Sequence, residues 1–371
     1  MAPFDANKLT RLMTASGVDL LLASTRHNIR YLTGGYYFHF VAQATRAGQS
    51  QYLPFVGLPR GRAEDAFYVG RVGERGQIEA EHLWIRDRME TPGGTLPPIE
   101  QVVQTVGRLG LDGSTIAVEM PFLPADAFLA LRRGLPKANL VDATPILDEL
   151  RAIKTAEEIA RLRRVHDRVA EAIQAGFAAG RRGLTTAEIA GEVRREMARR
   201  DVTFLFAFTC AGPGTLRAPS SVRWEPGQVL HIDAGGEEGD YLADICRMGC
   251  FGKPSPLAQK LYTACLSVQG QVEQAIRPGL PCGELHTIGE RGAASGGDGF
   301  HGRFVAHGIG MVSHEAPDVS ANSSRLLEPG MVLSIETEFI HRDVGHVKIE
   351  DTVAVTNTGC EGLGELGREW Q

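Results

Sequence analysis

The residues from 229 to 247, VLHIDAGGEEGDYLADICR, place two carboxylates among apolar side chains. β-prone stretches on either side of an acidic, glycine-containing turn predict two antiparallel strands. With Glu238 and Gly239 as the loop, Asp233 and Asp244 lie opposite each other on one face of this hairpin. Two ionised carboxylates in that arrangement repel each other, and a buried charge has to be paired or to coordinate a metal. A divalent cation is the simplest chemistry that resolves the repulsion.

A second acidic hairpin is predicted near the end of the sequence. Its expected strands, at 331–339 and 347–355, carry Glu336 and Glu350. A turn centred on Asp343 would place these two carboxylates opposite each other as well. The chain therefore holds two pairs of facing carboxylates.

The two hairpins belong to an internal repeat. Each follows a long helix and a glycine-led heptapeptide, GLTTAEI at 183–189 and GLPCGEL at 279–285. A seven-residue echo is weak evidence by itself, but the matched hairpins strengthen it. Two helix–helix–hairpin halves related by a pseudo-twofold axis would bring all four carboxylates to the centre of one sheet.

Two histidines add a second type of ligand. His307 lies in the segment FVAHGIG, and His314 begins the segment HEAP. An imidazole favours zinc, manganese, iron or cobalt over the magnesium or calcium of an all-oxygen site. A histidine alone is more often a core or surface residue, but beside four paired carboxylates His307 is predicted to bind metal. The alternative, that the acids are solvated turn residues, is disfavoured because each lies mid-strand among apolar residues.

Length and composition set the frame for these segments. A chain of 371 residues is too long for one typical core, so two domains are expected. A net charge of −6 without a basic run gives no attraction to nucleic acid or to a membrane surface, which favours a small-molecule or peptide substrate. The N-terminus has no apolar signal core and no stretch approaches a membrane span, so a cytoplasmic protein is expected. The six cysteines are sparse and predict no disulfide framework, and Cys246 and Cys250 are interpreted as packed thiols rather than a zinc pair.

Residues 1–150 are predicted to form an α/β domain. A first helix runs through Leu9 and Met13, and alternating patterns predict strands at 18–24, 66–69, 83–85 and 116–119 and helices at 99–109 and 125–132. The aromatic segment Tyr36–Phe40 fits a partly buried strand better than a lid or a subunit contact. A GxGxxG pattern at 297–302 has no strand before it and predicts a loop, not a dinucleotide site.

A new pattern begins after residues 150–154. Thr155 and Glu158 form a capping box. The helix that follows has a continuous apolar stripe, formed by Ile159, Leu162, Val165, Val169 and Ile173. Residues 151–371 are therefore predicted to form the second domain, which carries both acidic hairpins.

At these residues the chain resembles the pita-bread metallohydrolases, which include Xaa-Pro aminopeptidase, prolidase, methionine aminopeptidase and the metal-free creatinase. The segment HEAP matches the family's active-site histidine at His314, and DLLLASTRHNIRYLTG is similar to the amino-terminal creatinase/prolidase domain. The five family metal ligands match Asp233 in HIDAGG, Asp244 in ADICR, His307 in AHGIG, Glu336 in LSIET and Glu350 in KIEDT. The resemblance implies an amino-terminal α/β, ribonuclease-H-like domain, a carboxy-terminal pita-bread α+β domain with pseudo-twofold symmetry, and a homodimer.

The resemblance also implies a dinuclear hydrolase of a peptide-like C–N bond. Asp244 and Glu350 would bridge two divalent ions, with Asp233 on one ion and His307 and Glu336 on the other. Manganese is expected first, with cobalt, zinc or iron as alternatives. The ions would share a water and lower its pKa toward neutrality, and the resulting hydroxide would attack the substrate carbonyl.

Two residues are predicted to be catalytic. Glu336, or a carboxylate beside it, would take and return the proton during the reaction. His314 would donate a hydrogen bond to the substrate or to the developing oxyanion without binding metal.

Positions around the ligands depart from the peptidase pattern. Arg217 and Arg303 stand where the family usually has histidines, and Lys348 stands where it has arginine. The two arginines suit a substrate that carries a carboxylate, and Glu338 could meet a cationic group; a salt bridge is the equal alternative for each. These four residues are the predicted substrate-binding set.

Three hypotheses on function follow. The first is an Xaa-Pro dipeptidase or aminopeptidase acting on short peptides with a free carboxylate. The second is a creatinase-like hydrolase or lyase acting on a small carboxylate-bearing molecule that is not a peptide. The third, a partner-binding module without chemistry, is disfavoured because all five ligands are retained.

Overall fold

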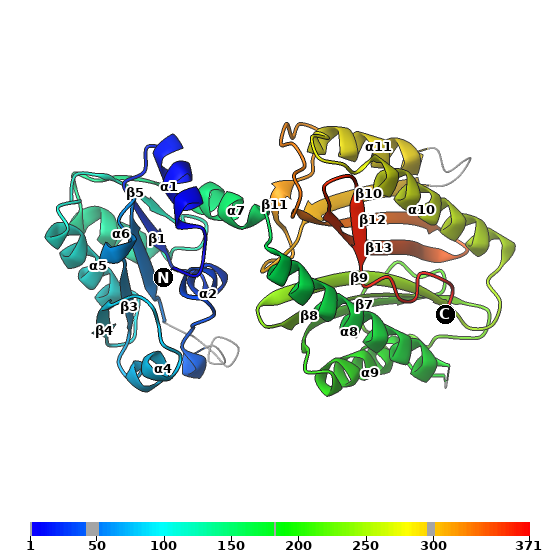
Figure 1. Ribbon diagram of the computed structural model, residues 1–371. Coiled ribbons are helices and arrows are strands. Elements are labelled where there is room, and N and C mark those ends of the chain that lie inside the picture. The colour runs from blue at the N-terminus through cyan, green and yellow to red at the C-terminus, as the bar shows by residue number, and fades with distance from the viewer. Residues whose placement is uncertain (1, 42–51, 182, 295–300) are drawn as a thin grey trace. The chain divides into compact units, whose positions relative to one another are not determined.

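The protein was analysed as a computed structural model that describes residues 2–41, 52–181, 183–294 and 301–371. Its chain divides into two compact units, Met1–Leu150 and Arg151–Gln371 (Figure 1). Most of the GxGxxG pattern at 297–302 lies outside the described residues, although Gly302 belongs to a strand.

Unit 1 is a six-stranded sheet with helices on both faces. The strand order is β4-β3-β2-β1-β5-β6, in which β1 pairs antiparallel with β2 and parallel with β5. The strands are β1 (Leu20–Ala23), β2 (Phe55–Pro59), β3 (Phe67–Arg71), β4 (Asp87–Thr91), β5 (Thr115–Val118) and β6 (Asn139–Asp142). The helices are α1 (Ala6–Ala15), α2 (Arg26–Thr33), α4 (Arg75–Ala80), α5 (Leu96–Arg108), α6 (Ala125–Gly134) and α7 (Thr144–Ala152), which runs across the division between the units.

Alternation along β1 explains why this sheet has two cores. Side chains of successive strand residues point to opposite faces. Leu20 and Leu22 pack into the core that contains residues of α5 and α6. Leu21 and Ala23 pack into the core that contains residues of α1, α2 and α7. A short run of leucines can therefore serve two helical layers at once.

Two expectations for unit 1 were wrong. The segment 83–85 is not a strand, because β4 begins at Asp87; Leu83 and Ile85 are instead buried from the turn that precedes it. The aromatic segment that begins at Tyr36 is not a strand either. It is irregular and ends in a helical turn that leaves Phe40 70% exposed, while Tyr36 donates a hydrogen bond of 2.6 Å to Glu74. Residues 42–51 lie outside the described part.

Unit 2 is an eight-stranded sheet of two similar halves. The strand order is β11-β10-β12-β13-β9-β8-β7, with β14 paired to β13. The strands are β7 (Thr203–Ala211), β8 (Val229–Glu238), β9 (Tyr241–Cys250), β10 (His301–Gly308), β11 (Glu315–Asp318), β12 (Val332–His341), β13 (Gly345–Val355) and β14 (Cys360–Leu363). The helices are α8 (Ala156–Gly180) and α9 (Thr186–Arg199) in the first half and α10 (Pro256–Ala275) and α11 (Cys282–Ala294) in the second.

The predicted repeat appears as matched structure. One core joins α8 and α9 to β7, β8 and β9, and another joins α10 and α11 to β10, β12 and β13. The two heptapeptides form equivalent turns before α9 and α11, in which Gly183 has a φ of 76° and Gly279 a φ of 83°. A side chain is strained at such angles, so glycine is the residue that fits. The capping box at Thr155 is present, as predicted.

The second hairpin has the predicted register, and the first does not. Glu336 pairs with Glu350. In the first hairpin Asp233 pairs with Cys246 rather than with Asp244. The turn is one residue later than expected, because Gly239 (φ 55°) and Asp240 (φ 76°) adopt the two left-handed conformations of a tight hairpin turn. This shift moves each partner by two residues, so both aspartates stay on one face.

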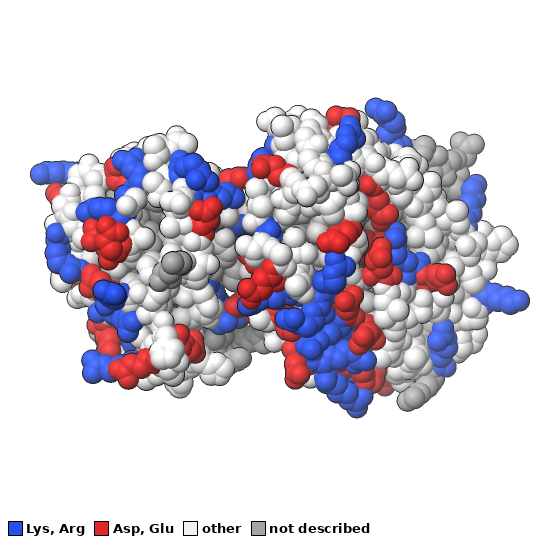
Figure 2. Space-filling view, viewed as in Figure 1, with Lys and Arg blue, Asp and Glu red and all other residues white. Residues whose placement is uncertain are grey.

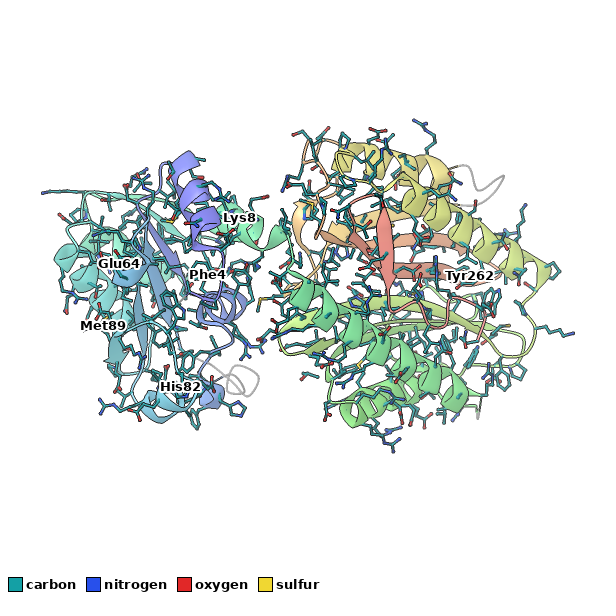
Figure 3. The ribbon with its side chains drawn as sticks, in the orientation of Figure 1. Phe4, Lys8, Glu64, His82, Met89 and Tyr262 are labelled. Carbon is teal, nitrogen blue, oxygen red and sulfur yellow. The ribbon has the colours of Figure 1, made fainter. Side chains whose placement is uncertain are left out.

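The segment after β14 is tied to the second half of unit 2. The hydroxyl of Tyr262 on α10, labelled in Figure 3, donates a hydrogen bond of 2.6 Å to the carbonyl of Arg368. Its ring lies 4.8 Å from that of Trp370. The buried guanidinium of Arg247 donates to the carbonyl of Gly364 at 2.7 Å and to the carbonyl of Glu350 at 2.7 Å. Arg247 thus links the segment after β14 to the strand that carries Glu350.

The outer surface of α8 and α9 mixes charges of both signs. Figure 2 shows basic and acidic side chains interspersed over these helices. Arg164 and Arg168 contact Glu238 at 2.6 and 3.0 Å, and Arg200 contacts Glu171 at 2.9 Å. Basic side chains here are therefore matched locally by acids. Within the described ranges, every helix is too short or too polar to cross a bilayer.

Candidate metal centre

The five predicted ligands converge on the centre of the sheet in unit 2. They come from five strands: Asp233 from β8, Asp244 from β9, His307 from β10, Glu336 from β12 and Glu350 from β13. Four of them are buried, and Glu336 is half-buried. Strands β9 and β13 pair at the middle of the sheet, where Glu350 lies opposite Cys246. The pairing of the two hairpins therefore creates the cluster.

Asp244, His307 and Glu350 form one compact group of potential ligands. One ligand atom of each lies within 4.8 Å of the others, and all three side chains are buried. The Oδ2 atom of Asp244 accepts a hydrogen bond of 3.0 Å from Ser313, and Glu350 accepts one of 2.8 Å from Ser334. No basic side chain of the described residues forms an ion pair with Asp244.

His307 is oriented for coordination. Its Nδ1 lies 3.1 Å from the carbonyl of Gly308, an arrangement in which Nδ1 carries the proton and Nε2 keeps its lone pair. Nε2 is buried and has no hydrogen-bond partner among the described residues, and it lies 3.6 Å from Oε1 of Glu336. An orphaned imidazole nitrogen beside two carboxylates is the donor set of a divalent transition metal. This group therefore fits a metal ion.

The other side of the cluster is different, because Lys348 lies inside it. Its Nζ is 2.7 Å from Asp233, 2.6 Å from Glu336 and 2.7 Å from Glu350. The guanidinium of Arg217 contacts the same oxygen of Asp233 at 2.5 Å. The carboxylates on this side already have positive partners within the protein.

The pKa values of the acids divide in the same way. Burial and the charge of Glu336 raise the pKa of Glu350 to about 7, and burial and Glu350 raise the pKa of Asp244 well above its usual range. Burial alone would also raise the pKa of Glu336, but the contacts with His307 and Lys348 outweigh it and lower that pKa to about 2. Asp244 and Glu350 are therefore the acids of the cluster whose ionised forms the protein's own cations stabilise least.

A second group of potential metal ligands, not predicted from the sequence, includes Asp233. His231, Asp233 and Cys246 have potential ligand atoms within 4.8 Å of one another, and all are buried. Burial raises the pKa of the Cys246 thiol well above its usual range, so the thiol stays protonated. The alternation of His231 and Asp233 along one strand was the available signal, because residues two apart share a face.

A pocket of about 210 Å³ opens beside the ligands. It is lined by Arg217, Arg303, Val305, His314, Glu336 and Glu338. Arg303 forms no ion pair with the described residues, whereas Arg217 is engaged by Asp233 at 2.5 Å and lies 3.8 Å from Glu338. Of the four predicted substrate-binding residues, the pocket thus includes three. Lys348 is buried in the carboxylate cluster instead.

His314 lies over the metal group without joining it. Its ring stacks on that of His307, with centroids 3.8 Å apart and an angle of 15° between the planes. Its Nδ1 is 3.2 Å from the hydroxyl of Ser313, which also donates to Asp244. Burial and the neighbouring His307 lower the pKa of His314, so it is neutral near pH 7. A neutral imidazole can still donate one hydrogen bond into the pocket.

A buried ion triad holds the residue after His314. Glu315 is 2.9 Å from Lys154 and 3.2 Å from Arg151, and all three side chains are about 2% exposed. Both basic residues come from the segment before α8. The charges compensate one another in a place without solvent, and the triad fixes the start of β11 and with it the position of His314.

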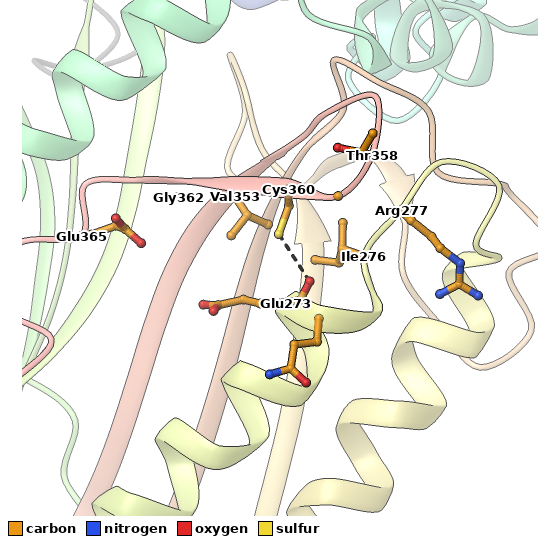
Figure 4. Close-up of a pocket in the computed structure, with 10 residues that line it drawn as sticks. Glu273, Ile276, Arg277, Val353, Thr358, Cys360, Gly362 and Glu365 are labelled. Atoms are coloured by element: carbon orange, nitrogen blue, oxygen red, sulfur yellow. Dashed lines mark hydrogen bonds between the residues drawn. The ribbon is translucent and has the colours of Figure 1, made fainter.

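A larger pocket is separate from this centre. It has a volume of about 440 Å³ and lies between α10 and the β13–β14 connection (Figure 4). Its lining residues include Glu273, Arg277, Cys360 and Glu365, and none of the predicted site residues. In Figure 4 the Cys360 thiol points to the carbonyl of Glu273, 3.5 Å away.

Comparison with known proteins agrees with this geometry. Residues 160–357 match Metallopeptidase family M24, and residues 6–153 match the Creatinase/Prolidase N-terminal domain. An uncharacterized peptidase of Staphylococcus aureus (strain USA300) is 32% identical over 275 residues, which cover 72% of this chain and 76% of the relative. The chain belongs to the M24 metallopeptidases, and it is a metal-dependent hydrolase of a peptide-like C–N bond.

Solved structures share the whole architecture. The Xaa-Pro dipeptidase from Bacillus anthracis has a TM-score of 0.84 at 24% identity and covers 99% of both chains. The prolidase from Pyrococcus horikoshii OT3 has a TM-score of 0.81 at 21% identity, also over 99% of both chains. The expectation of an amino-terminal creatinase-like domain followed by a pita-bread domain is confirmed.

Proposed function

We propose that the chain is a dipeptidase-type enzyme that hydrolyses short Xaa-Pro peptides with a free carboxylate. The observation that supports this most directly is the group of Asp244, Glu350 and the orphaned Nε2 of His307, which lies beside the pocket with Arg303. Two of the structures with the same fold carry the names Xaa-Pro dipeptidase and prolidase. The two units would be the two domains of the enzyme, divided at residues 150 and 151.

The residues around the pocket would have different roles in the reaction. Asp244, His307 and Glu350 would hold a divalent ion, which when bound would supply a water of lowered pKa and a Lewis acid for a carbonyl. Arg303 holds the substrate carboxylate with its forked donors. His314 donates a hydrogen bond to the oxygen on which negative charge develops. Glu336, at the edge of the pocket and with a low pKa, is ionised near neutral pH and can accept a proton.

Arg217 would play a different part from the one expected. Its guanidinium already contacts Asp233 at 2.5 Å and lies 3.8 Å from Glu338. A side chain held in this way shapes the wall of the pocket and leaves Arg303 as the cation for the substrate. Glu338, which is 3.3 Å from His346, is engaged in the same wall.

The remaining details are also proposals. The mixture of carboxylates and imidazole suits manganese, iron, cobalt or zinc, and manganese is the proposed metal. A homodimer and a cytoplasmic location complete the proposal by analogy with the family that the sequence resembles.

A panel of substrates tests the peptide assignment. Xaa-Pro dipeptides should be cleaved, and their amides, which lack the carboxylate, should be poor substrates. Chelation should abolish turnover, and manganese, cobalt, iron or zinc should restore it. Cleavage that survives complete metal removal would contradict the proposal.

A small non-peptide acid is the second candidate. The pocket volume of about 210 Å³ is below the roughly 300–1,000 Å³ typical of ligand sites, which favours a compact substrate. Guanidino acids and betaines belong in the same panel. Turnover of one of these, with no cleavage of any dipeptide, would favour the creatinase-like alternative.

A further inference from the structure

The ammonium of Lys348 lies where a metal ion is expected. It is within 2.7 Å of three carboxylates: Glu350 of its own strand β13, Glu336 of β12 and Asp233 of β8. A lysine ammonium has three N–H donors and no acceptor. That of Lys348 donates a hydrogen bond of 2.7 Å to Asp233 and forms ion pairs with Glu336 and Glu350. The side chain is 4% exposed. The charge of Lys348 is therefore buried among three residues that should ligate metal.

Asp233 has a second positive partner. Its Oδ2 atom accepts from Lys348 at 2.7 Å and from Arg217 at 2.5 Å. A divalent ion at this oxygen would lie beside two fixed positive charges. Like charges at such short range repel strongly in a buried site with little solvent. Asp233 is thus a poor ligand in this chain, although its position matches the family.

The charges of the cluster balance with one divalent ion. Once a cation binds beside Asp244 and Glu350, the carboxylates of Asp233, Asp244, Glu336 and Glu350 carry four negative charges. Lys348 and Arg217 compensate two of them, and one divalent ion compensates the other two. Two divalent ions would leave an excess of two positive charges on these residues, which Glu338, 3.8 Å from Arg217 and 3.3 Å from His346, reduces to one.

One position for that ion remains. Asp244, His307 and Glu350 lie within 4.8 Å of one another, and the Nε2 atom of His307 has no hydrogen-bond partner in the described part of the chain. Neither Lys348 nor Arg217 contacts Asp244 in an ion pair. Asp244 therefore lacks a cation of the protein's own, whereas Glu350 lies between Asp244 and His307 on one side and Lys348, 2.7 Å away, on the other.

We propose that Lys348 takes the place of one of the two divalent ions expected from the sequence. The enzyme then holds a single ion at Asp244, His307 and Glu350, while Lys348 neutralises Asp233 and Glu336 permanently. This inference rests on the metal centre of the proposed function and is independent of which peptide is cleaved. It also implies that chelation leaves half of the cluster compensated, so the metal-free protein keeps its fold.

Metal content tests the proposal directly. The full-length protein is saturated with Mn²⁺, freed of excess by gel filtration and analysed by mass spectrometry for metal per chain. The expected content is about one ion for the wild type and about two for Lys348→Met, which keeps the side-chain length but frees three carboxylates. Lys253→Met, at an exposed lysine, is the matched control and should hold about one.

Each outcome decides the question. Two ions per wild-type chain, or a folded Lys348→Met variant that still holds one, would overturn the role of Lys348. A wild type that binds no ion would instead refute the metal centre of the proposed function. Should Lys348→Met fail to fold, electron paramagnetic resonance of the Mn²⁺-loaded wild type still decides: the spectrum of an isolated ion is expected, and that of an exchange-coupled pair would refute the proposal.

Discussion

The two hairpins at the centre of unit 2 share one backbone plan and carry different chemistry. They are matched about Cys246 and Glu350, which pair with each other where β9 meets β13. Two residues before Cys246 the first hairpin has Asp244, and two residues before Glu350 the second has Lys348. One matched position therefore carries opposite charges. Because of the symmetry of the fold, the side chains of Asp244 and Lys348 both point into the carboxylate cluster. One is a potential metal ligand and the other is a cation.

The outer strands differ in a related way. On β10, His307 pairs with Ser334 of β12, whereas at the matched place on β7 Cys210 pairs with His231 of β8. His307 is oriented by the carbonyl of Gly308 at 3.1 Å, while neither ring nitrogen of His231 has a hydrogen-bond partner among the described residues. Only the second half therefore supplies an oriented imidazole next to Asp244. The metal group combines the aspartate of one half with the histidine of the other.

The largest expected effect on metal content and turnover comes from removing the negative charge of Asp244, which stands where the second hairpin has Lys348. Asp244→Asn should lose the metal ion and lower kcat/KM by about 1,000-fold, an order of magnitude beyond the roughly 10- to 100-fold effect of residues that only support a ligand. Metal content and turnover are measured together. Asp240→Asn, in the turn of the same hairpin, is the control and should change neither. Full metal content in Asp244→Asn would show that Asp244 of the first hairpin is not a metal ligand and that its contrast with Lys348 of the second hairpin is wrong.

Much of this centre could be predicted from the sequence because strands have a period of two. Apolar residues on both sides of Glu336 and Glu350 predicted strands, and the turn between them gave the observed register. For Asp233 and Asp244 the turn was placed one residue too early. The correct face was still predicted, because moving the turn by one residue moves each partner by two.

The cation inside the cluster could not be predicted in the same way. Lys348 was assigned to the substrate because it stands where the family has arginine, but the direction of a long side chain depends on three other strands. Asp233 is 115 residues away in sequence, and its contact with Lys348 arises only when β9 and β13 pair. In unit 1, β2, β4 and β6 were missed. A strand at 83–85 was expected wrongly, since a short apolar run does not distinguish a strand from a buried turn.

His166, a buried histidine outside both hairpins, should affect stability at low pH without affecting metal binding. Burial lowers the pKa of His166, on α8, from 6.5 to about 4, even though its Nδ1 lies 2.7 Å from the carbonyl of Leu162. The unfolded chain takes up a proton below pH 6.5 and the folded chain does not, so stability should fall as the pH drops from 6.5 to 4. At about 1.4 kcal/mol per pH unit the loss is about 3 kcal/mol.

Urea unfolding of the metal-free protein between pH 7 and pH 4 measures this loss. His166→Gln keeps a donor for the Leu162 carbonyl but cannot be protonated, so its stability should fall by about 3 kcal/mol less than that of the wild type. Its metal content at pH 7 should be unchanged. Identical pH profiles for the two proteins would mean that His166 is accessible to protons in the folded state.

A smaller effect is expected for the histidine that stacks on the metal ligand. His314→Ala should lower kcat by about 100-fold, the scale for a lost hydrogen-bond donor to the transition state, and should keep the metal ion. His314→Gln, which retains a donor, should recover part of the loss. Metal analysis alongside the kinetics distinguishes this role from ligation. Loss of the ion in His314→Ala would assign His314 to the metal group.

The smallest effect separates the two arginines of the pocket. Arg303 lines the pocket, has no ion pair with the described residues and is the proposed cation for a substrate carboxylate. Arg303→Ala should raise KM about tenfold with little change in kcat, because a contact made equally in the ground state and the transition state affects binding alone. An amidated dipeptide, which has no carboxylate to hold, should show no such increase.

Arg217→Ala should behave differently because Arg217 contacts Asp233 at 2.5 Å. Removing it takes away one of the two positive charges on that carboxylate and leaves Lys348 as the other. The expected result is a change in kcat or in metal affinity, with the preference for a free carboxylate retained. Equal KM effects of both substitutions, restricted to substrates with a carboxylate, would show that both arginines bind substrate. The proposed difference, in which Arg217 stabilises the carboxylate cluster and Arg303 binds the substrate, would then be wrong.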